Sequence, residues 1–376
     1  MGQKILCLIL LACLLLTGCT MPNSTIVSVE PHRESRNTVQ DASPSAATYD
    51  ELCQALEAIV STGTESATIR MPDYPSQSIE TSLQQACRYI TREYPIGAYA
   101  IDEIHYEIGT SLGRPAAAVT VSYHHGRTEI QRIRIVRTEE EAQKAVTDAL
   151  ARFDQSVVIL KPQETIQDVT KLVQTYARDN PQKIMEVPQV TETLYGHGAQ
   201  RVAELIFTYQ TDRDSLRRMQ TQVKPVFDAA VLYVSGDDAD RQKHAQLYSF
   251  LMERFDYKLE TSITPAYSLL RHGVGDSRAF ATVYAAMCRA AGLSCQVITG
   301  TRNGEPRTWN IIELDGYCYH VDLLRCSEGG RYRECTDEEM EGYVWDYSEY
   351  PVCAVAPVPE QEKLLETQPT GNIEEF

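Results

Sequence analysis

The sequence has few basic residues relative to its acidic ones, and this shortage excludes a large class of partners. Its 376 residues include 35 lysines and arginines against 52 aspartates and glutamates, for a formal net charge of −17. Nucleic-acid binding requires a basic face that neutralises phosphates. The short basic runs, such as Arg213 to Arg218 on an expected helix, are interpreted as solvated faces. We therefore expect no nucleic acid among the partners.

The sequence also lacks the cysteine and histidine spacing of metal sites. It contains no CxxC pair and no Cys/His pattern suited to zinc, although eight of its 11 cysteines follow Cys19. We expect no metal ion and no cofactor. Two cysteine pairs are candidate disulfides, and spacing alone leaves their pairing open: Cys53 with Cys87, and Cys326 with Cys335.

The apolar run near the N-terminus, Ile5 to Leu16, is too short to span a bilayer as a mature helix. It follows a lysine and ends in Leu-Thr-Gly-Cys at 16–19, and this order indicates an export signal. The ending resembles the lipobox of bacterial lipoproteins. The resemblance implies cleavage before Cys19 and a diacylglyceryl thioether on its sulfur. Residues 1–18 are then a signal peptide, and the chain is lipid-anchored to the bacterial cell membrane, facing outward. A plain secretory signal with an incidental cysteine is the alternative.

The remaining chain divides into two flanks and three folded parts. Residues 19–48 are rich in Ser, Thr, Asn and Pro, and residues 354–376 in Pro, Glu and Gln, which is typical of a flexible tether and a disordered tail. Between them, the order strand, helix, strand, strand and helix occurs twice with an offset of about 87 residues. We predict an α+β protein with two repeated α/β modules, 49–137 and 138–236, followed by a third domain at 237–353. The modules carry no clustered histidines, cysteines or carboxylates, so we interpret them as a binding surface or a spacer.

The third domain holds the residues that carry chemistry. A glycine-rich turn leads into a helix that begins at or next to Ser277, and later strands carry further polar residues. Such an arrangement is how a nucleophile, a base and an orienting residue are often assembled. The motifs occur in this order: Gly273 to Ala281, Ala290 to Cys295, Arg307 to Asn310, and Asp315 to Asp322.

These motifs, in this order, resemble the bacterial transglutaminase-like domain, a papain-like α+β fold of the thiol-protease type. In that family a cysteine opens the helix as nucleophile, a histidine precedes the Trp-Asn pair as its base, and an aspartate after the next strand holds the imidazole. The resemblance places Ser277, Arg307 and Asp322 at these positions, so the triad is degenerate.

The replaced residues predict the loss of thiol chemistry. A serine hydroxyl is far less acidic than a thiol and needs a base within hydrogen-bond reach. Arg307 cannot be that base, because its guanidinium stays protonated. We expect Arg307 to pair with Asp322 instead, and to be able to hold a ligand carboxylate or phosphate. Trp309 is interpreted as a core residue, as a wall of the cleft, or as both.

Two interpretations of the domain follow. The leading one is a non-catalytic domain of a cell-surface lipoprotein that binds a peptide, a glycan or an envelope component through the inherited cleft, with Ser277 as a helix N-cap. The alternative is an envelope serine-dependent peptidase or amidase in which His320, on the same strand face as Asp322, serves Ser277 as base. That histidine lies a strand step of roughly 6–7 Å from the usual base position. His272 is a weaker candidate for the same role.

Overall fold

The computed structural model describes residues 43–259 and 262–354. The predicted signal peptide, the lipidation site Cys19, most of the tether and nearly all of the tail lie outside the described residues. Within the described part of the chain, every helix is too short or too polar to cross a membrane.

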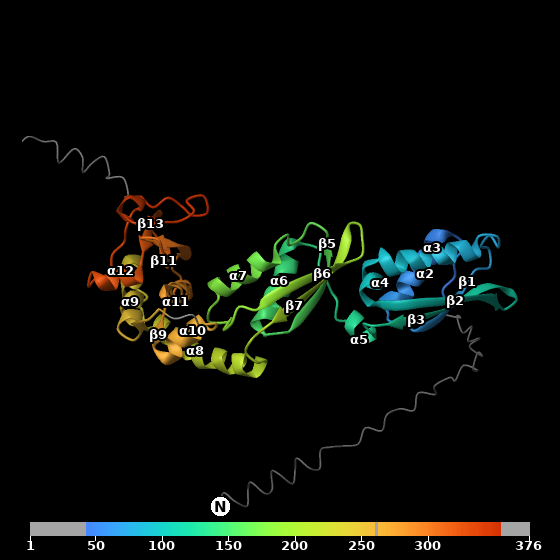
Figure 1. Ribbon diagram of the computed structural model, residues 1–376, viewed down its shortest axis with the longest axis horizontal. Coiled ribbons are helices and arrows are strands. Elements are labelled where there is room, and N and C mark those ends of the chain that lie inside the picture. The colour runs from blue at the N-terminus through green and yellow to red at the C-terminus, as the bar shows by residue number, and fades with distance from the viewer. Residues whose placement is uncertain (1–42, 260–261, 355–376) are drawn as a thin grey trace, which may run out of the picture. The chain divides into compact units, whose positions relative to one another are not determined.

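The first module places helices against a three-stranded antiparallel sheet with strand order β1-β3-β2 (Figure 1). Its helix α2 begins after Thr48, whose hydroxyl accepts a hydrogen bond from the backbone N–H of Glu51. Leu52 and Leu56 are wholly buried because their four-residue spacing puts them on one helix face. The elements are α2 (Tyr49–Ser61), β1 (Ser66–Arg70), α3 (Ile79–Arg92), α4 (Pro95–Ala100), β2 (Ile101–Ser111) and β3 (Arg114–Tyr123).

The second module has a four-stranded sheet with order β4-β5-β7-β6, covered by α6 and α7. From α6 to β7 this module runs helix, strand, helix, strand, strand, and the first module has the same order with one additional short helix, α4. The strand order β5-β7-β6 matches β1-β3-β2. That they are duplicates of one unit stays a prediction. The elements are α5 (Arg127–Ile130), β4 (Arg134–Ile135), α6 (Glu139–Ala151), β5 (Ser156–Pro162), α7 (Val169–Asp179), β6 (Gln189–Tyr195) and β7 (Gln200–Thr208).

Two predicted boundaries need correction. The strand β4, at 134–135, falls within the first predicted module, but it pairs with β5 of the second sheet. Helix α8 (Arg213–Tyr233) was assigned to the second module, yet Leu216, Val223 and Phe227 pack into the core of the third domain. An amphipathic pattern shows that a helix has a buried face, but it does not say which core that face joins.

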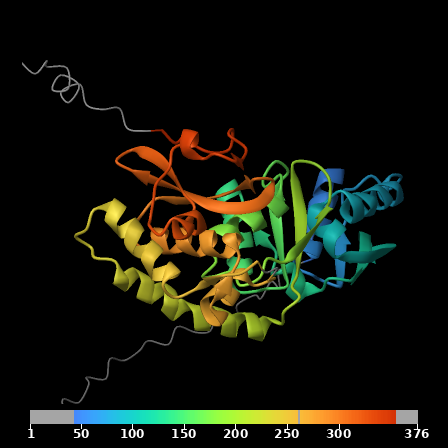
Figure 2. The same ribbon diagram turned by 60° about the vertical axis from the view of Figure 1, so that its left-hand side comes forward.

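The third domain has a four-stranded antiparallel sheet with order β12-β11-β10-β13. Figure 2 shows helices on one side of this sheet and the C-terminal segment on the other. The elements after α8 are α9 (Asp240–Met252), β8 (Asp256–Tyr257), α10 (Pro265–His272), β9 (Val274–Gly275), α11 (Ser277–Ala290), β10 (Cys295–Arg302), β11 (Glu305–Leu314), β12 (Tyr317–Val321), α12 (Leu323–Glu328), the 3-10 helix η1 (Asp337–Glu339) and β13 (Tyr343–Val344).

Strand alternation separates the two faces of this sheet. Ile312 packs toward α11, and the Nδ2 amide of Asn310 donates to the carbonyl of Ala281 in that helix at 2.9 Å. Trp309 and Ile311 point the other way and form a second core with the C-terminal segment. The α+β class predicted from the sequence is confirmed, with mixed helices and sheets in each part.

Candidate functional site

Ser277 is the first residue of α11, and its position differs from the predicted N-cap. The cap is Asp276, whose carboxylate accepts a hydrogen bond from the backbone N–H of Ala279 at 2.8 Å. A carboxylate at this place also complements the helix dipole. The Ser277 hydroxyl instead accepts a hydrogen bond from the backbone N–H of Thr308 at 3.3 Å. This contact ties the start of α11 to β11 beside Arg307.

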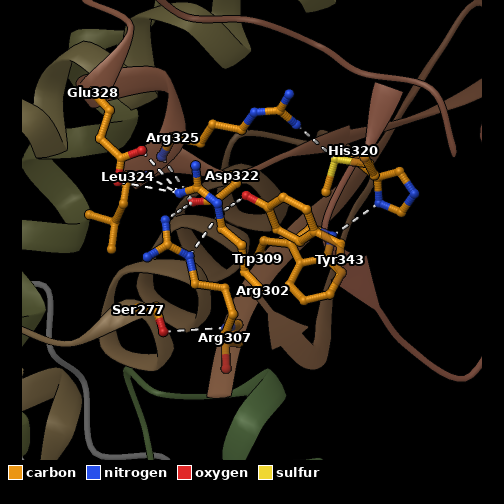
Figure 3. A network of polar contacts seen from close by, with 12 residues as sticks. Ser277, Arg302, Arg307, Trp309, His320, Asp322, Leu324, Arg325, Glu328 and Tyr343 are labelled. Atoms are coloured by element: carbon orange, nitrogen blue, oxygen red, sulfur yellow. Dashed lines mark hydrogen bonds and ion pairs between the residues drawn. The ribbon is translucent and has the colours of Figure 1, made fainter. Parts of the chain in front are cut away.

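Arg307 and Asp322 form the ion pair expected from the sequence (Figure 3). Nε of Arg307 donates to Oδ2 of Asp322 at 2.8 Å, and Nη2 donates to Oδ1 at 2.9 Å. The two side chains are 10% and 2% exposed. The register of β11 and β12 explains why these two side chains meet. Trp309 lies opposite Asp322, and Arg307, two residues before Trp309, points to the same face of the sheet. The pair is a forked, charge-assisted contact of the strong kind.

The carboxylate of Asp322 has three further donors. It caps α12, accepting from the backbone N–H groups of Leu324 at 3.0 Å and Arg325 at 3.2 Å. The hydroxyl of Tyr343 donates to Oδ2 at 2.7 Å. Burial, followed by the charge of Asp322, raises the pKa of Tyr343, so this phenol stays a donor. Five hydrogen bonds therefore hold the carboxylate of Asp322. It positions Arg307, caps α12 and binds the hydroxyl of Tyr343.

Arg307 stays charged at this place. Burial lowers the pKa of Arg307, but the hydrogen bonds and the charge of Asp322 outweigh that effect and raise the pKa above its ordinary value. A guanidinium cannot accept a proton. Arg307 therefore neutralises Asp322 and removes no proton from Ser277.

His320 is wholly buried, and its two ring nitrogens are occupied by other groups. The indole Nε1 of Trp309 lies 3.1 Å from Nδ1, and Oδ1 of Asp337 lies 2.8 Å from Nε2. Because an indole N–H can only donate, Nδ1 is the acceptor and the proton of the neutral ring is on Nε2, directed at Asp337. Figure 3 shows Ser277 and His320 on opposite sides of Trp309 and Tyr343. The arrangement gives His320 a structural role and directs neither nitrogen at Ser277.

The weaker candidate, His272, is the last residue of α10. Its ring meets the edge of Tyr267 at a centroid distance of 5.5 Å. The described contacts of Ser277 include no imidazole.

Trp309 is a core residue with no exposed surface, which corrects its prediction as a wall of the cleft. Its ring makes edge contacts with Tyr343 at 5.1 Å and Trp345 at 5.9 Å. The missing side chain of Gly300 makes room for it, since a Cβ there would lie 2.8 Å from the indole ring. Trp309 therefore sets the position of His320 and of β11, and it offers no face to a ligand.

Three buried or half-buried groups gather in a way that resembles a metal site. Ligand atoms of His320, Asp337 and Cys353 lie within 4.8 Å of one another. The hydrogen bond from Trp309 places the ring proton on Nε2, which leaves that nitrogen without a lone pair for a cation. Burial and the nearby charge of Asp337 raise the pKa of the Cys353 thiol to about 12, so it stays protonated. The donor set fits a Trp–His–Asp hydrogen-bond chain better than a metal centre.

The candidate disulfides are not formed in the structure, where the eight cysteines of the described residues are free thiols. Sγ of Cys326 lies 3.4 Å from the carbonyl of Arg333. The pairing of Cys53 with Cys87 and of Cys326 with Cys335 stays a prediction for an oxidising environment.

Two residues of the site were not identified from the sequence. Tyr343 donates to Asp322, and Asp337 accepts from His320. Both come from the C-terminal segment, beyond the motifs that carry the family resemblance. Thr336 and Glu339 form a capping box at the start of η1, which fixes the backbone that carries Asp337.

Comparison with known proteins supports one assignment. Residues 228–339 match the family described as the transglutaminase-like superfamily. No curated protein matches the chain. A solved structure titled a TGase aligns at 10% identity and a TM-score of 0.26, covering 57% of this chain and 63% of that one. A protein from Cytophaga hutchinsonii, provisionally named a cysteine protease, aligns at 13% identity and a TM-score of 0.26, covering 39% of this chain and 65% of its own. The chain thus spans less than two thirds of either structure. By the family match, residues 228–339 form a transglutaminase-like domain.

Proposed function

We propose that this domain does not catalyse transfer or hydrolysis, and that it binds a peptide, a glycan or another envelope component. The chain is a lipoprotein that presents the domain on the outer side of a bacterial membrane through Cys19. The observation that carries the non-catalytic assignment is the ion pair of Arg307 with Asp322, which occupies the place of the family's base and its orienting residue.

The chemistry of the three positions supports this assignment. A thiol becomes a thiolate near neutral pH beside an imidazolium and a helix N-terminus, whereas a serine hydroxyl needs a neutral base within about 3 Å. Ser277 has the backbone N–H of Thr308 as its described partner, and that group is a donor. A hydroxyl that accepts a hydrogen bond from an amide, with no base beside it, is a poor nucleophile.

The serine-dependent peptidase or amidase is not favoured. It requires His320 to reach Ser277, and His320 is held by Trp309 and Asp337 in a core that excludes water. To serve as a base, the ring would have to leave both partners and cross the sheet face occupied by Trp309.

Binding is tested with the mature chain and isolated peptidoglycan from a bacterial envelope. We expect the chain to co-sediment with this material, and the Ser277→Ala variant to co-sediment equally. We also expect no release of ammonia from glutamine-containing peptides and no cleavage of wall peptides. Turnover that disappears in Ser277→Ala would overturn the proposal.

The membrane anchor is tested separately by labelling with an alkyne-bearing fatty acid. We expect label on the full chain and none on Cys19→Ser, which should leave the membrane fraction. Equal labelling of the variant would remove the lipoprotein assignment and leave a plain secreted protein.

A further inference from the structure

A hollow of about 360 Å³ lies beside Asp322, between α12, the segment after it and Met340. This size is at the lower end of the range of small-ligand sites. The charged residues in its wall are Asp322, Arg325, Glu328, Arg331 and Arg333. Three arginines in one small hollow are unusual in a chain with a formal net charge of −17.

The carboxylates of this wall are already paired with arginines. Asp322 is paired with Arg307, and Glu328 accepts from Nη1 of Arg302 at 3.0 Å. Among the three arginines of the wall, Arg333 is neutralised by Glu339, with Nη2 donating to Oε1 at 2.5 Å. These pairs leave the charges of Arg325 and Arg331 to be balanced.

Arg325 is held in place by neutral groups. Nη2 donates to the backbone carbonyl of Glu339 at 3.1 Å, and Nη1 lies 3.4 Å from the thioether sulfur of Met340, a weak acceptor. The guanidinium also faces the ring of Tyr343 at 5.7 Å. The group is half-buried and fixed, yet the structure describes no carboxylate partner for it.

Arg331 is exposed at the rim of the hollow and forms no ion pair with any residue in 43–259 or 262–354. The exposed Arg331 and the half-buried Arg325 are two donors on the wall of one hollow, and both can contact the same anionic group. Guanidinium groups match the geometry of carboxylate and phosphate oxygens.

We propose that this hollow binds an anionic oxygen group, a carboxylate or a phosphate, of the envelope ligand, with Arg325 and Arg331 as its donors. The inference rests on the proposed binding function and names the chemistry of the group that is recognised. Asp322 connects the hollow to the site of the former triad. It does not repel the anion, because Arg307 already neutralises its charge.

The test titrates the mature chain with inorganic phosphate and, in a second arm, with acetate, both at constant ionic strength, and follows binding by calorimetry. We expect saturable binding of at least one probe, weakened at least tenfold in Arg331→Gln, whose exposed side chain is not needed for folding. Arg325→Gln should weaken it by a similar factor. The matched control is Arg217→Gln, which removes an exposed arginine of α8 and should leave binding unchanged.

The two arms distinguish the source of the oxygen group. Saturation by phosphate alone indicates a phosphorylated ligand, and saturation by acetate indicates a carboxylate. Failure of both probes to saturate, or equal binding by the parent chain and Arg331→Gln, would overturn the inference.

The result is separable from the function proposed above. If the hollow fails but the chain still co-sediments with peptidoglycan, only this inference is lost. If both probes bind through Arg331 while Ser277-dependent turnover is found, the non-catalytic assignment is lost and the anion site stands.

Discussion

The guanidinium of Arg307 has one carboxylate partner, Asp322, whereas Asp322 keeps three other donors if Arg307 is removed. The pair is therefore asymmetric. Removing the side chain of Asp322 leaves the almost fully buried charge of Arg307 without a partner. Removing the side chain of Arg307 leaves the carboxylate of Asp322 still held by Tyr343 and two backbone N–H groups.

This asymmetry predicts unequal costs of substitution. Asp322→Ala should lower the free energy of unfolding by about 3–5 kcal/mol, as expected when one partner of a buried ion pair is removed. Arg307→Met should cost clearly less, because its stem fills the space and Asp322 remains hydrogen-bonded. Urea denaturation of both variants measures the difference. Equal losses would show that the other three donors do not sustain the carboxylate.

The contact of Trp309 with His320 predicts a single tautomer. The ring of His320 should be neutral at pH 6.5, where an ordinary histidine is half protonated, with its proton on Nε2. Burial lowers the pKa of His320, and Asp337 only partly offsets this. Nitrogen chemical shifts report the tautomer directly. In Trp309→Phe the acceptor loses its donor, and the tautomer preference should weaken. A proton found on Nδ1 of the parent chain would contradict this geometry.

A second buried histidine predicts a loss of stability in mild acid. Nδ1 of His244 lies 3.1 Å from the hydroxyl of Tyr284, and Nε2 has no hydrogen-bond partner in the described part of the chain. The charged imidazolium carries a proton on both nitrogens, so protonation of the ring would leave a buried N–H at Nε2 without an acceptor. Burial lowers the pKa of His244 to about 4, and Asp240 opposes this weakly.

The sign of the effect follows from the two states. Below pH 6.5 the unfolded chain binds a proton at His244 that the folded chain does not, so stability falls as the pH falls toward 4. The contribution of His244 to the slope should approach about 1.4 kcal/mol per pH unit. Denaturation between pH 6.5 and 5.5, above most carboxylate titrations, measures it. His244→Phe should have a shallower slope than the parent chain, and an unchanged slope would assign the effect to other groups.

The meeting of Arg307 with Asp322 could be predicted because it depends on strand alternation and on the order of two neighbouring strands. The alternation of side-chain directions appears in the sequence as a period of two, and the order of the two strands follows from their succession along the chain. The surroundings of Trp309 could not be predicted in the same way. Its burial depends on Gly300 and on the cover of β13, which come from segments that no local pattern links to the Trp-Asn pair.

The role of His320 also could not be predicted from the local sequence pattern. Its strand face was predicted, but its partner Asp337 lies 17 residues further along the chain. For Ser277, the local sequence pattern is ambiguous. Asp276 and Ser277 are both good N-cap residues, so the sequence does not decide between them, and the backbone geometry at 276 does.

The most direct test of the central claim is the reactivity of Ser277 toward a fluorophosphonate probe, which labels serines activated by a base. The mature chain at pH 7.5 should show no labelling above that of Ser277→Ala, and a known serine hydrolase in the same tube should label fully. Labelling of the parent chain that disappears in Ser277→Ala would show that Ser277 is an activated nucleophile, and would contradict the account of a non-catalytic transglutaminase-like domain.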